Sequence, residues 1–368
     1  MLERFTVPRN DQVRVAEPAL RRTVTDVFVA CGVPPDEAAG GADVLVSTDL
    51  RGVETHGVSN MLRNYVGWFR DGTLQPAPRP ILVRETPGTA TFDGDRGLGL
   101  LLGTKAMQLA IDKARETGVG VVTMRNSGHL GAVGHFAMQA ARQDMVGLCM
   151  TAMSLLVVPT FGASPRLGTN PIAFAAPAMT APYLLYDAAT STIAGNKVAL
   201  ARRLGTTMEP GWIAGPDGTP IMERHEMTPG DMYALGAFSL LPLGGTREQG
   251  SHKGYGLALM VEVLTTLLAG ALPMMLEDDR RLGRHHFAAY DIAAFGDLAT
   301  FKQTMDRMLQ TLTETPPAPG HNRVVYPGLP EHETELDRRA NGIPLHREVI
   351  TWFNRCTEEL GVPPLETM

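Results

Sequence analysis

The sequence lacks the features of several protein classes. Its three cysteines (Cys31, Cys149 and Cys356) have no CxxC spacing, so they form neither a disulfide framework nor a zinc site. The basic residues are scattered and the net charge is −6, which argues against a nucleic-acid partner. The N-terminal residues lack a signal peptide's apolar core, and no apolar run reaches the ~18 residues of a membrane span. We expect a cytoplasmic protein with no membrane partner, whose cysteines are small buried apolar residues.

Hydrophobic residues make up 44% of the 368 residues, which is enough for two or three domains. Helical spacing of apolar residues predicts three helices before residue 72. Further helices are predicted at about 100–117, 131–143, 254–270, 298–313 and 344–360, the last with Pro344 near its start. Short β-type runs are found at 118–124, 145–153, 171–178 and 182–189.

The last predicted strands follow one another too closely for helical crossovers, so the sheet must be at least partly antiparallel. The proline-rich QPAPRP at 75–80 reads as a linker. We predict an α+β fold in which a helical domain is built from residues 1–78 and 246–368, around a β-rich domain at 79–245. The glycines of GLGLLLG at 97–103 have the spacing GxGxxxG and follow no strand, so a Rossmann site is not predicted there.

Titrating and hydrogen-bonding side chains crowd the segment RGVETHGVSN at 51–60. Arg51, Thr55 and His56 lie close together, and Gly57 leaves room for a ligand to approach. A positioned histidine can give and take a proton at neutral pH. The alternative is that Thr55 merely caps the helix that follows.

A glycine-rich turn at 125–136, RNSGHLGAVGHF, joins a predicted strand to a predicted helix. Backbone N–H groups at such a helix start attract phosphate, so the segment is a candidate contact for a dinucleotide. A tight turn that only needs small residues is the alternative. His129 lies in the turn, whereas His135 lies deeper in the helix and is predicted to be structural.

Three further stretches carry candidate residues. Thr169 and Asn170 occupy a turn that needs no ligand to explain it. Asp187 ends a strand, where it either caps a following helix or orients a histidine. His252 and Lys253 stand at the start of an apolar helix, where cations are disfavoured unless an anion binds; a solvated lysine is the alternative.

Six segments together resemble the malate/L-lactate dehydrogenase family that is unrelated to the Rossmann-fold lactate dehydrogenases. They occur in the family's order and read DLRGVETHGV, FDGDRGLG, NSGHLGA, LGTNPIAFAAPA, DAATSTIAGNK and SHKGYGLALMVEVL. Relatives in this family include ketimine, ureidoglycolate and diketogulonate enzymes. The resemblance implies a homodimer with a mostly antiparallel mixed sheet in a central NAD(P)-binding domain.

The resemblance also implies roles for individual residues. His56 matches the proton donor, Thr55 takes the place of the usual serine, and Asp187 matches the acid of the charge relay. Thr169 falls where the family touches its substrate. The expected cofactor contacts, to NAD or NADP, are His129, Leu130, Gly131, Ala132, Val133, Asn170, His252 and Lys253.

Two positions depart from the family pattern. Asn60 stands where an arginine commonly grips the substrate carboxylate, so Arg51 or Arg63 is expected to substitute. The loop that often reads PGE has Leu329 in its third place. The basic run RRLGRHH at 280–286 could reach a 2′-phosphate, but a solvated loop is the preferred interpretation.

The leading hypothesis is reversible hydride transfer between nicotinamide and a 2-hydroxy acid/2-oxo acid pair, with His56 moving the proton. The nearest alternative is a reductase of a cyclic imine or an uncharged ketone, because Asn60 replaces the arginine. A metal-dependent hydrolase using His56, His129 and Asp187 has no HxH or HExxH spacing to support it, so no metal ligands are predicted. A cofactor-binding protein without catalysis is a further alternative.

Overall fold

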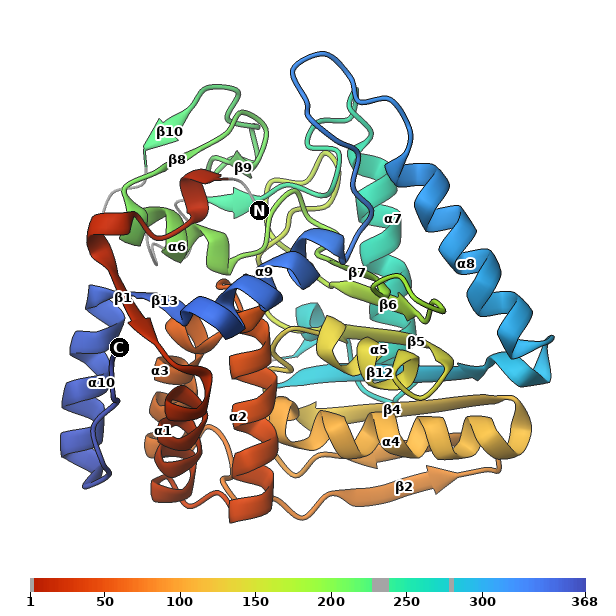
Figure 1. The fold of residues 1–368 in the computed structure, drawn as a ribbon, viewed down its shortest axis with the longest axis horizontal. Coiled ribbons are helices and arrows are strands. Elements are labelled where there is room, and N and C mark those ends of the chain that lie inside the picture. The colour runs from red at the N-terminus through yellow and green to blue at the C-terminus, as the bar shows by residue number, and fades with distance from the viewer. Residues whose placement is uncertain (1–2, 227–237, 278–280) are drawn as a thin grey trace.

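The computed structural model describes residues 3–226, 238–277 and 281–368, and a seven-stranded sheet is its centre (Figure 1). The strand order is β2-β3-β4-β12-β5-β6-β7, and every neighbouring pair is antiparallel except β3 with β4. Their bounds are Ile81–Glu85 (β2), Thr89–Asp93 (β3), Val119–Ser127 (β4), Met145–Ala152 (β5), Ile172–Ala176 (β6), Leu184–Ala188 (β7) and Gly283–Asp291 (β12). The prediction of a mostly antiparallel mixed sheet in an α+β chain is confirmed.

Each face of the sheet is covered by different helices, because successive strand residues point to opposite faces. Cys149 and Ala173 belong to the main core, which also contains residues of α4 (Gly99–Thr117) and α5 (Gly134–Ala141). Their neighbours Met150 and Ile172 pack instead with residues of α7 (Ser251–Glu262) and the π-helical turn Val263–Leu267. The sheet is therefore buried on both faces over its central strands.

Helices from the two ends of the chain lie side by side at one end of the sheet (Figure 1). They are α1 (Glu17–Ala30), α2 (Pro35–Leu50), α3 (Val58–Arg70), α9 (Leu329–Asn341) and α10 (Arg347–Leu360). The short strands β1 (Gln12–Val15) and β13 (Ile343–His346) pair there and join the two termini. The predicted helices before residue 72 are confirmed.

The other elements surround this frame. They are α6 (Asn196–Leu204), α8 (Leu298–Thr313), the 3-10 turns Glu3–Phe5, Arg9–Asp11, Met274–Leu276 and Ile292–Ala294, and the two-residue strands β8 (Thr207–Met208), β9 (Ile213–Ala214), β10 (His225–Glu226) and β11 (Ser239–Leu240). The bounds of α8 match the prediction for 298–313. Among the residues that the structure describes, no helix is both long and apolar enough to cross a membrane.

Two sequence predictions are wrong. Pro344 lies in β13 opposite Arg14, and the helix starts only at Arg347. The run at 280–286 is not a solvated loop over its described part: from residue 283 it forms the start of β12, the middle strand of the sheet. Arg284 and His285 are buried there, and Arg284 pairs with Glu277 instead of facing a cofactor.

Of the cysteines, Cys149 and Cys356 are buried and Cys31 is half-buried, and all three are free thiols. Burial raises the pKa of each thiol, so they stay protonated at neutral pH. The prediction that they act as apolar residues is confirmed for the two buried ones.

Candidate active site

A short loop between α2 and α3 carries Thr55 and His56. The carboxyl group of Asp49, which is fully buried near the end of α2, packs against the loop and accepts a hydrogen bond from the Val58 N–H at 2.7 Å. Gly57 is needed at this point, because a Cβ there would lie 2.0 Å from Asp49 Oδ1. Asp49 therefore caps α3, and the expectation that Thr55 might do so is wrong.

His56 lies in a small cluster of aromatic and imidazole rings. Its Nδ1 is 2.9 Å from the Thr55 hydroxyl, and its ring stacks on His129 with centroids 5.7 Å apart and planes 10° apart. The Tyr65 hydroxyl, reaching in from α3, is 2.8 Å from His129 Nδ1. The structure thus brings His56 and His129, which are 73 positions apart in the sequence, into direct contact.

Hydrogen bonds fix the tautomer of His129 but leave that of His56 open. His129 Nδ1 accepts from the Gly131 N–H, so its proton is on Nε2 and Tyr65 is a second donor to Nδ1. On His56, the Thr55 hydroxyl can either donate to Nδ1 or accept from it. Only His56 can therefore exchange its proton without breaking a fixed set of bonds.

Burial keeps both imidazoles neutral. It lowers the pKa of His56 to about 4 and that of His129 to about 3, where His56 and His285 add to the effect. His285, in β12, supports the cluster from behind through its Nε2, which is 3.0 Å from the Gly128 carbonyl. A neutral His56 is ready to accept a proton.

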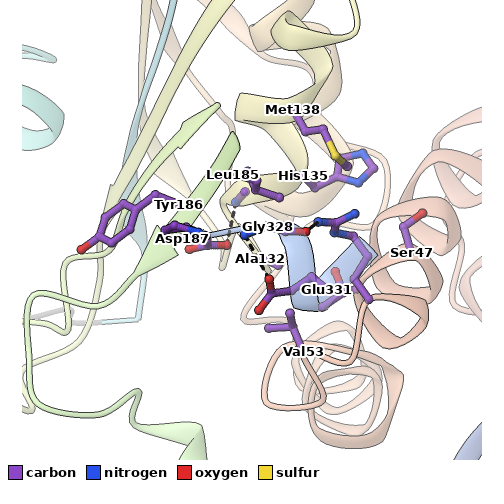
Figure 2. A pocket seen from close by; sticks show the side chains of 14 residues that line it. Ser47, Val53, Ala132, His135, Met138, Leu185, Tyr186, Asp187, Gly328 and Glu331 are labelled. Atoms are coloured by element: carbon purple, nitrogen blue, oxygen red, sulfur yellow. Dashed lines mark hydrogen bonds between the residues drawn. The ribbon is translucent and has the colours of Figure 1, made fainter. Parts of the chain in front are cut away.

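A cavity lies between the α2–α3 loop, α5, β7 and the start of α9 (Figure 2), and none of the rings of the cluster is among its lining residues. Val53 lines it from the loop, Ala132 from the 129–133 turn, and Asp187 from the end of β7. Gly328, in the left-handed region at φ 99°, lets the chain pass against β7, where a Cβ would lie 2.8 Å from Leu185 N.

Asp187 faces this cavity but does not cap the helix that follows it. Its Oδ2 accepts a hydrogen bond from the Gly134 N–H at 2.7 Å. The Asp187 side chain thus binds the start of α5, where the sequence analysis expected a phosphate to bind. Burial, with Glu331 nearby, raises the pKa of Asp187 to about 6. Among the interactions of the described residues, no hydrogen bond joins Asp187 to His56.

The remaining residues of the 129–133 turn have different surroundings. The side chains of Leu130 and Val133 are buried in the main core, while Ala132 lines the cavity. Gly131, at φ 80°, turns the chain where a Cβ would lie 2.9 Å from Leu100. Of the residues in this turn, only Ala132 is among those that line the cavity.

The residues expected to replace the missing arginine do not lie in the imidazole cluster. Arg51 lines the cavity and pairs with Glu335 of α9 at 3.0 Å. Arg63 lies over Trp352 of α10 and pairs with Glu348.

Asn60 instead has an arginine partner that the sequence did not reveal. Arg203, from α6, donates to Asn60 Oδ1 at 2.7 Å and to the Ser59 carbonyl at 3.2 Å. The Arg203 side chain is 9% exposed, and Asn60 Nδ2 is buried without a partner. The guanidinium of Arg203, which belongs to α6, thus contacts α3 about one helical turn after His56.

The N-terminus of α6 meets the His56 loop near Thr169. Asn196 donates to the Thr55 carbonyl at 2.9 Å, and a Cβ on Gly195 would lie 4.0 Å from the Thr169 methyl. Asn170 turns the other way, because its amide is buried and donates to Ala258 and Glu262 of α7. Thr169 is therefore near the loop, whereas the Asn170 side chain is part of the packing under α7.

His252 and Lys253 are both exposed in the first turn of α7. His252 Nδ1 lies 3.0 Å from Arg247 Nη1, so three basic side chains gather at this helix start. Ser251 is buried against Thr160. Cations at the N-terminus of a helix favour the binding of an anion there, as the sequence analysis predicted.

Within residues 3–226, 238–277 and 281–368, no group of three or more histidine, cysteine, aspartate or glutamate side chains is placed to hold a metal ion. Sequence reasoning missed Tyr65, Asn196, Arg203 and His285. Arg203 and His285 reach the site from elements distant in the chain, whereas Tyr65 lies on the helix that follows the His56 loop and Asn196 lies in the segment DAATSTIAGNK, where neither was singled out.

Comparison with known proteins gives consistent results. Residues 15–354 match the family model described as malate/L-lactate dehydrogenase. The chain is 38% identical to a malate dehydrogenase of Pyrococcus abyssi, over 100% of both chains, and 32% identical to an L-sulfolactate dehydrogenase of Methanocaldococcus jannaschii, over 93% of this chain and 96% of that one. The solved structure of a Pyrococcus horikoshii malate dehydrogenase superimposes with a TM-score of 0.87 at 35% identity, covering 98% of this chain and 99% of that one.

Proposed function

The chain belongs to the malate/L-lactate dehydrogenase family, and we propose from this premise that His56 moves the proton in the oxidation of a 2-hydroxy acid to a 2-oxo acid. The family makes the protein an NAD(P)-dependent dehydrogenase that acts on a hydroxy acid. The observation that carries the role of His56 is its place in the cluster: a neutral imidazole with an adjustable tautomer, packed on His129, in the loop whose Val53 lines the cavity.

The steps assigned to the protein follow from these contacts. A bound nicotinamide would supply the hydride acceptor for the carbon that bears the hydroxyl. His56 takes the hydroxyl proton at Nε2, while Nδ1–H donates to Thr55. In the reverse direction, a protonated His56 returns that proton to the forming alkoxide, and the negative charge of a bound carboxylate favours the protonated form. His129, fixed with its proton on Nε2, is a hydrogen-bond donor throughout.

We assign the cavity to the dinucleotide. At Ala132, Gly134 and Gly328 a ligand can approach the main chain closely, and Arg51 supplies a cation. The Asp187–Gly134 hydrogen bond supports this by holding the end of the 129–133 turn. The charge relay from Asp187 to His56 stays a prediction, as do the phosphate contacts of His252 and Lys253. The choice between NAD and NADP is left to experiment.

A carboxylate substrate needs a cation near His56, and Arg203 is the best placed candidate at Asn60. Its guanidinium is held by Asn60 and Ser59, and its Nε lies 3.6 Å from Glu348. The unpartnered Asn60 Nδ2 is a further donor. Malate and sulfolactate, named for two of the relatives, are both 2-hydroxy acids with a second anionic group, which supports an anionic substrate here.

A substrate panel tests this function. Oxidation of NADH and NADPH is measured with 2-oxo acids, cyclic imines and uncharged ketones. We expect the highest kcat/KM with a 2-oxo acid, and a fall of at least about tenfold for that substrate in Arg203→Leu, because a charged hydrogen bond is worth ~1.5–3 kcal/mol. A cyclic imine or a neutral ketone as the best substrate would contradict the assignment.

We also propose that the enzyme is a homodimer formed through α7 and the segment after it. Eight large apolar side chains in this region are at least 36% exposed: Leu257, Leu259, Met260, Val263, Leu267, Leu268, Leu272 and Leu276. An exposed apolar surface of this extent is normally covered by a partner. Sedimentation is expected to give twice the 39.7 kDa of one chain.

Leu268→Asp is expected to shift the protein toward the monomer, because it places a charge in the buried interface. Leu336→Asp is the control, since Leu336 is equally exposed but lies on the polar helix α9. A dimer that survives Leu268→Asp and is lost with Leu336→Asp would place the interface elsewhere.

A further inference from the structure

Two arginines tie the loop that carries His56 to α9. Arg51, at the start of the loop, reaches Glu335 and the Gly328 carbonyl. Arg338 reaches back from α9: its Nη2 lies 2.6 Å from Glu54 Oε1 and its Nη1 2.6 Å from the Asp49 carbonyl. Glu54 is two positions before His56.

The Glu54–Arg338 pair is buried, with side-chain exposures of 4% and 8%. A buried ion pair contributes little net stability, because desolvating both charges offsets their attraction. Removing only one partner is costly, since the other charge is left buried and unpaired. Stability alone therefore does not account for an ion pair at this place.

Geometry gives the pair a different role. The loop is short, and its own hydrogen bonds run from Val53 N to Thr48 O and from His56 N to Val53 O, each at 3.0 Å. These bonds set the local turn but not the position of the turn relative to the rest of the protein. Arg338 supplies such a reference, because it binds both the Glu54 side chain in the loop and the Asp49 carbonyl at the end of α2, just before the loop.

The helix that supplies Arg338 also forms a wall of the cavity. Gly328, before its first turn, and Glu331, within it, line the cavity that we assign to the dinucleotide. Arg338 lies on the next turns of the same rigid helix, where it meets the His56 loop. The same helix therefore contributes to the cavity wall and holds the loop that carries His56.

We propose that Glu54 and Arg338 are positioning residues for His56: the buried pair fixes the loop against α9, so that the imidazole is aligned with a substrate bound beside the cavity. This role rests on the proposed function, because alignment of His56 matters only if the protein is the dehydrogenase proposed above. Neither residue touches the substrate.

The single variants Glu54→Gln and Arg338→Met are measured first. A misplacement of about 1 Å can cost up to ~10²-fold in rate, so we expect kcat to fall about ten- to a hundredfold. The KM values for substrate and nucleotide are expected to change less than about threefold, because the cavity walls stay in place. Arg338→Lys is expected to recover part of the rate. The pH profile of kcat/KM gives a further readout, since a loosened loop exposes His56 and raises its pKa from about 4 toward its usual value.

The double variant Glu54→Gln/Arg338→Met separates positioning from stability. It removes both charges, so its Tm is expected to recover toward wild type. Its kcat is expected to stay low, because the tether is still missing. If kcat recovers along with Tm, the pair is only structural and the positioning role is overturned. The same conclusion follows if the folded single variants, checked by circular dichroism at the assay temperature, have the wild-type kcat.

A matched control comes from the same helix. Glu333 of α9 pairs with Arg323 in a bidentate ion pair that is exposed and does not touch the loop. Arg323→Gln is expected to leave kcat, KM and the pH profile unchanged. Failure of the proposed function can be told apart from failure of the positioning role. In the first case the wild-type protein would reduce no substrate at all. In the second case the wild type would be active and the variants equally active.

Discussion

Replacing His56 with alanine is expected to lower kcat for hydroxy-acid oxidation by about 10²–10⁴-fold, the usual contribution of a positioned general base. The hydroxyl proton must leave as the hydride leaves, and no other group in the cluster can take it. His129 already carries its proton on Nε2 and has its Nδ1 occupied by Gly131 and Tyr65. Tyr65 is buried, which raises the pKa of its hydroxyl and keeps it protonated.

Steady-state kinetics and nucleotide binding together test this expectation. Binding of NADH or NADPH, followed by nucleotide fluorescence, is expected to be unchanged in His56→Ala, because the cavity is lined by other residues. His321→Ala is the control, since His321 is exposed in a loop. Thr55→Val is expected to have a smaller effect than His56→Ala. A near-normal kcat in His56→Ala would remove the proton-transfer role from this residue.

Acidification between about pH 6.5 and 4 is expected to unfold the protein steeply. Burial lowers the pKa of six histidines: that of His129 to about 3, those of His56, His135, His285 and His286 to about 4, and that of His346 below its usual value. In this window the unfolded chain binds protons on these histidines that the folded protein does not. Stability therefore falls as the pH falls through the window.

Three buried carboxyl groups oppose this trend. Burial raises the pKa of Asp49 to about 8, that of Asp187 to about 6 and that of Glu54 above its usual value, so the folded protein binds protons there that the unfolded chain does not. The strongly shifted histidines outnumber these carboxyls, which leaves a net uptake of roughly two protons on unfolding near pH 5. The slope is then roughly 3 kcal/mol per pH unit, enough to exhaust a typical ~5–15 kcal/mol of stability within a few units.

Urea unfolding at a series of pH values measures this slope. His286→Gln is expected to reduce the slope by about one proton, because it removes one buried titrating group in β12. His321→Gln, at an exposed position, is expected to leave it unchanged. Stability that is flat or rising as the pH falls from 6.5 to 4 would show that these imidazoles are not buried as described.

Local pattern was sufficient to predict most of the helices and the character of the sheet. Helix α3 has a wholly apolar side that ends at Asp71 and Gly72, and α8 has regular spacing with Asp297 as its cap. The central strand β12 was missed because its first half, GRHH, has the composition of a surface loop. Those polar groups are buried because they find partners: Glu277, seven positions earlier, pairs with Arg284, and Thr151, 134 positions earlier, bonds to His285.

The candidate site was predictable where a motif carried it and not where packing made it. The segments around His56, His129 and Asp187 were identifiable from their composition, and the contact between His56 and His129 was consistent with that prediction. Helix α9 was missed, since LPEHETELDRRAN is almost entirely polar and has no apolar stripe. Arg338 of this helix forms a buried ion pair with Glu54, and no spacing rule in the sequence predicts such a pair.

Transfer of a deuterium label tests the central claim most directly. A 2-hydroxy acid carrying deuterium at C2 is incubated with the protein and NAD or NADP in one turnover, and the reduced nucleotide is examined by mass spectrometry. We predict that the wild type places one deuterium on the nicotinamide ring and that His56→Ala does so far more slowly. Reduced nucleotide without deuterium, or equal rates for the two proteins, would contradict direct hydride transfer assisted by His56.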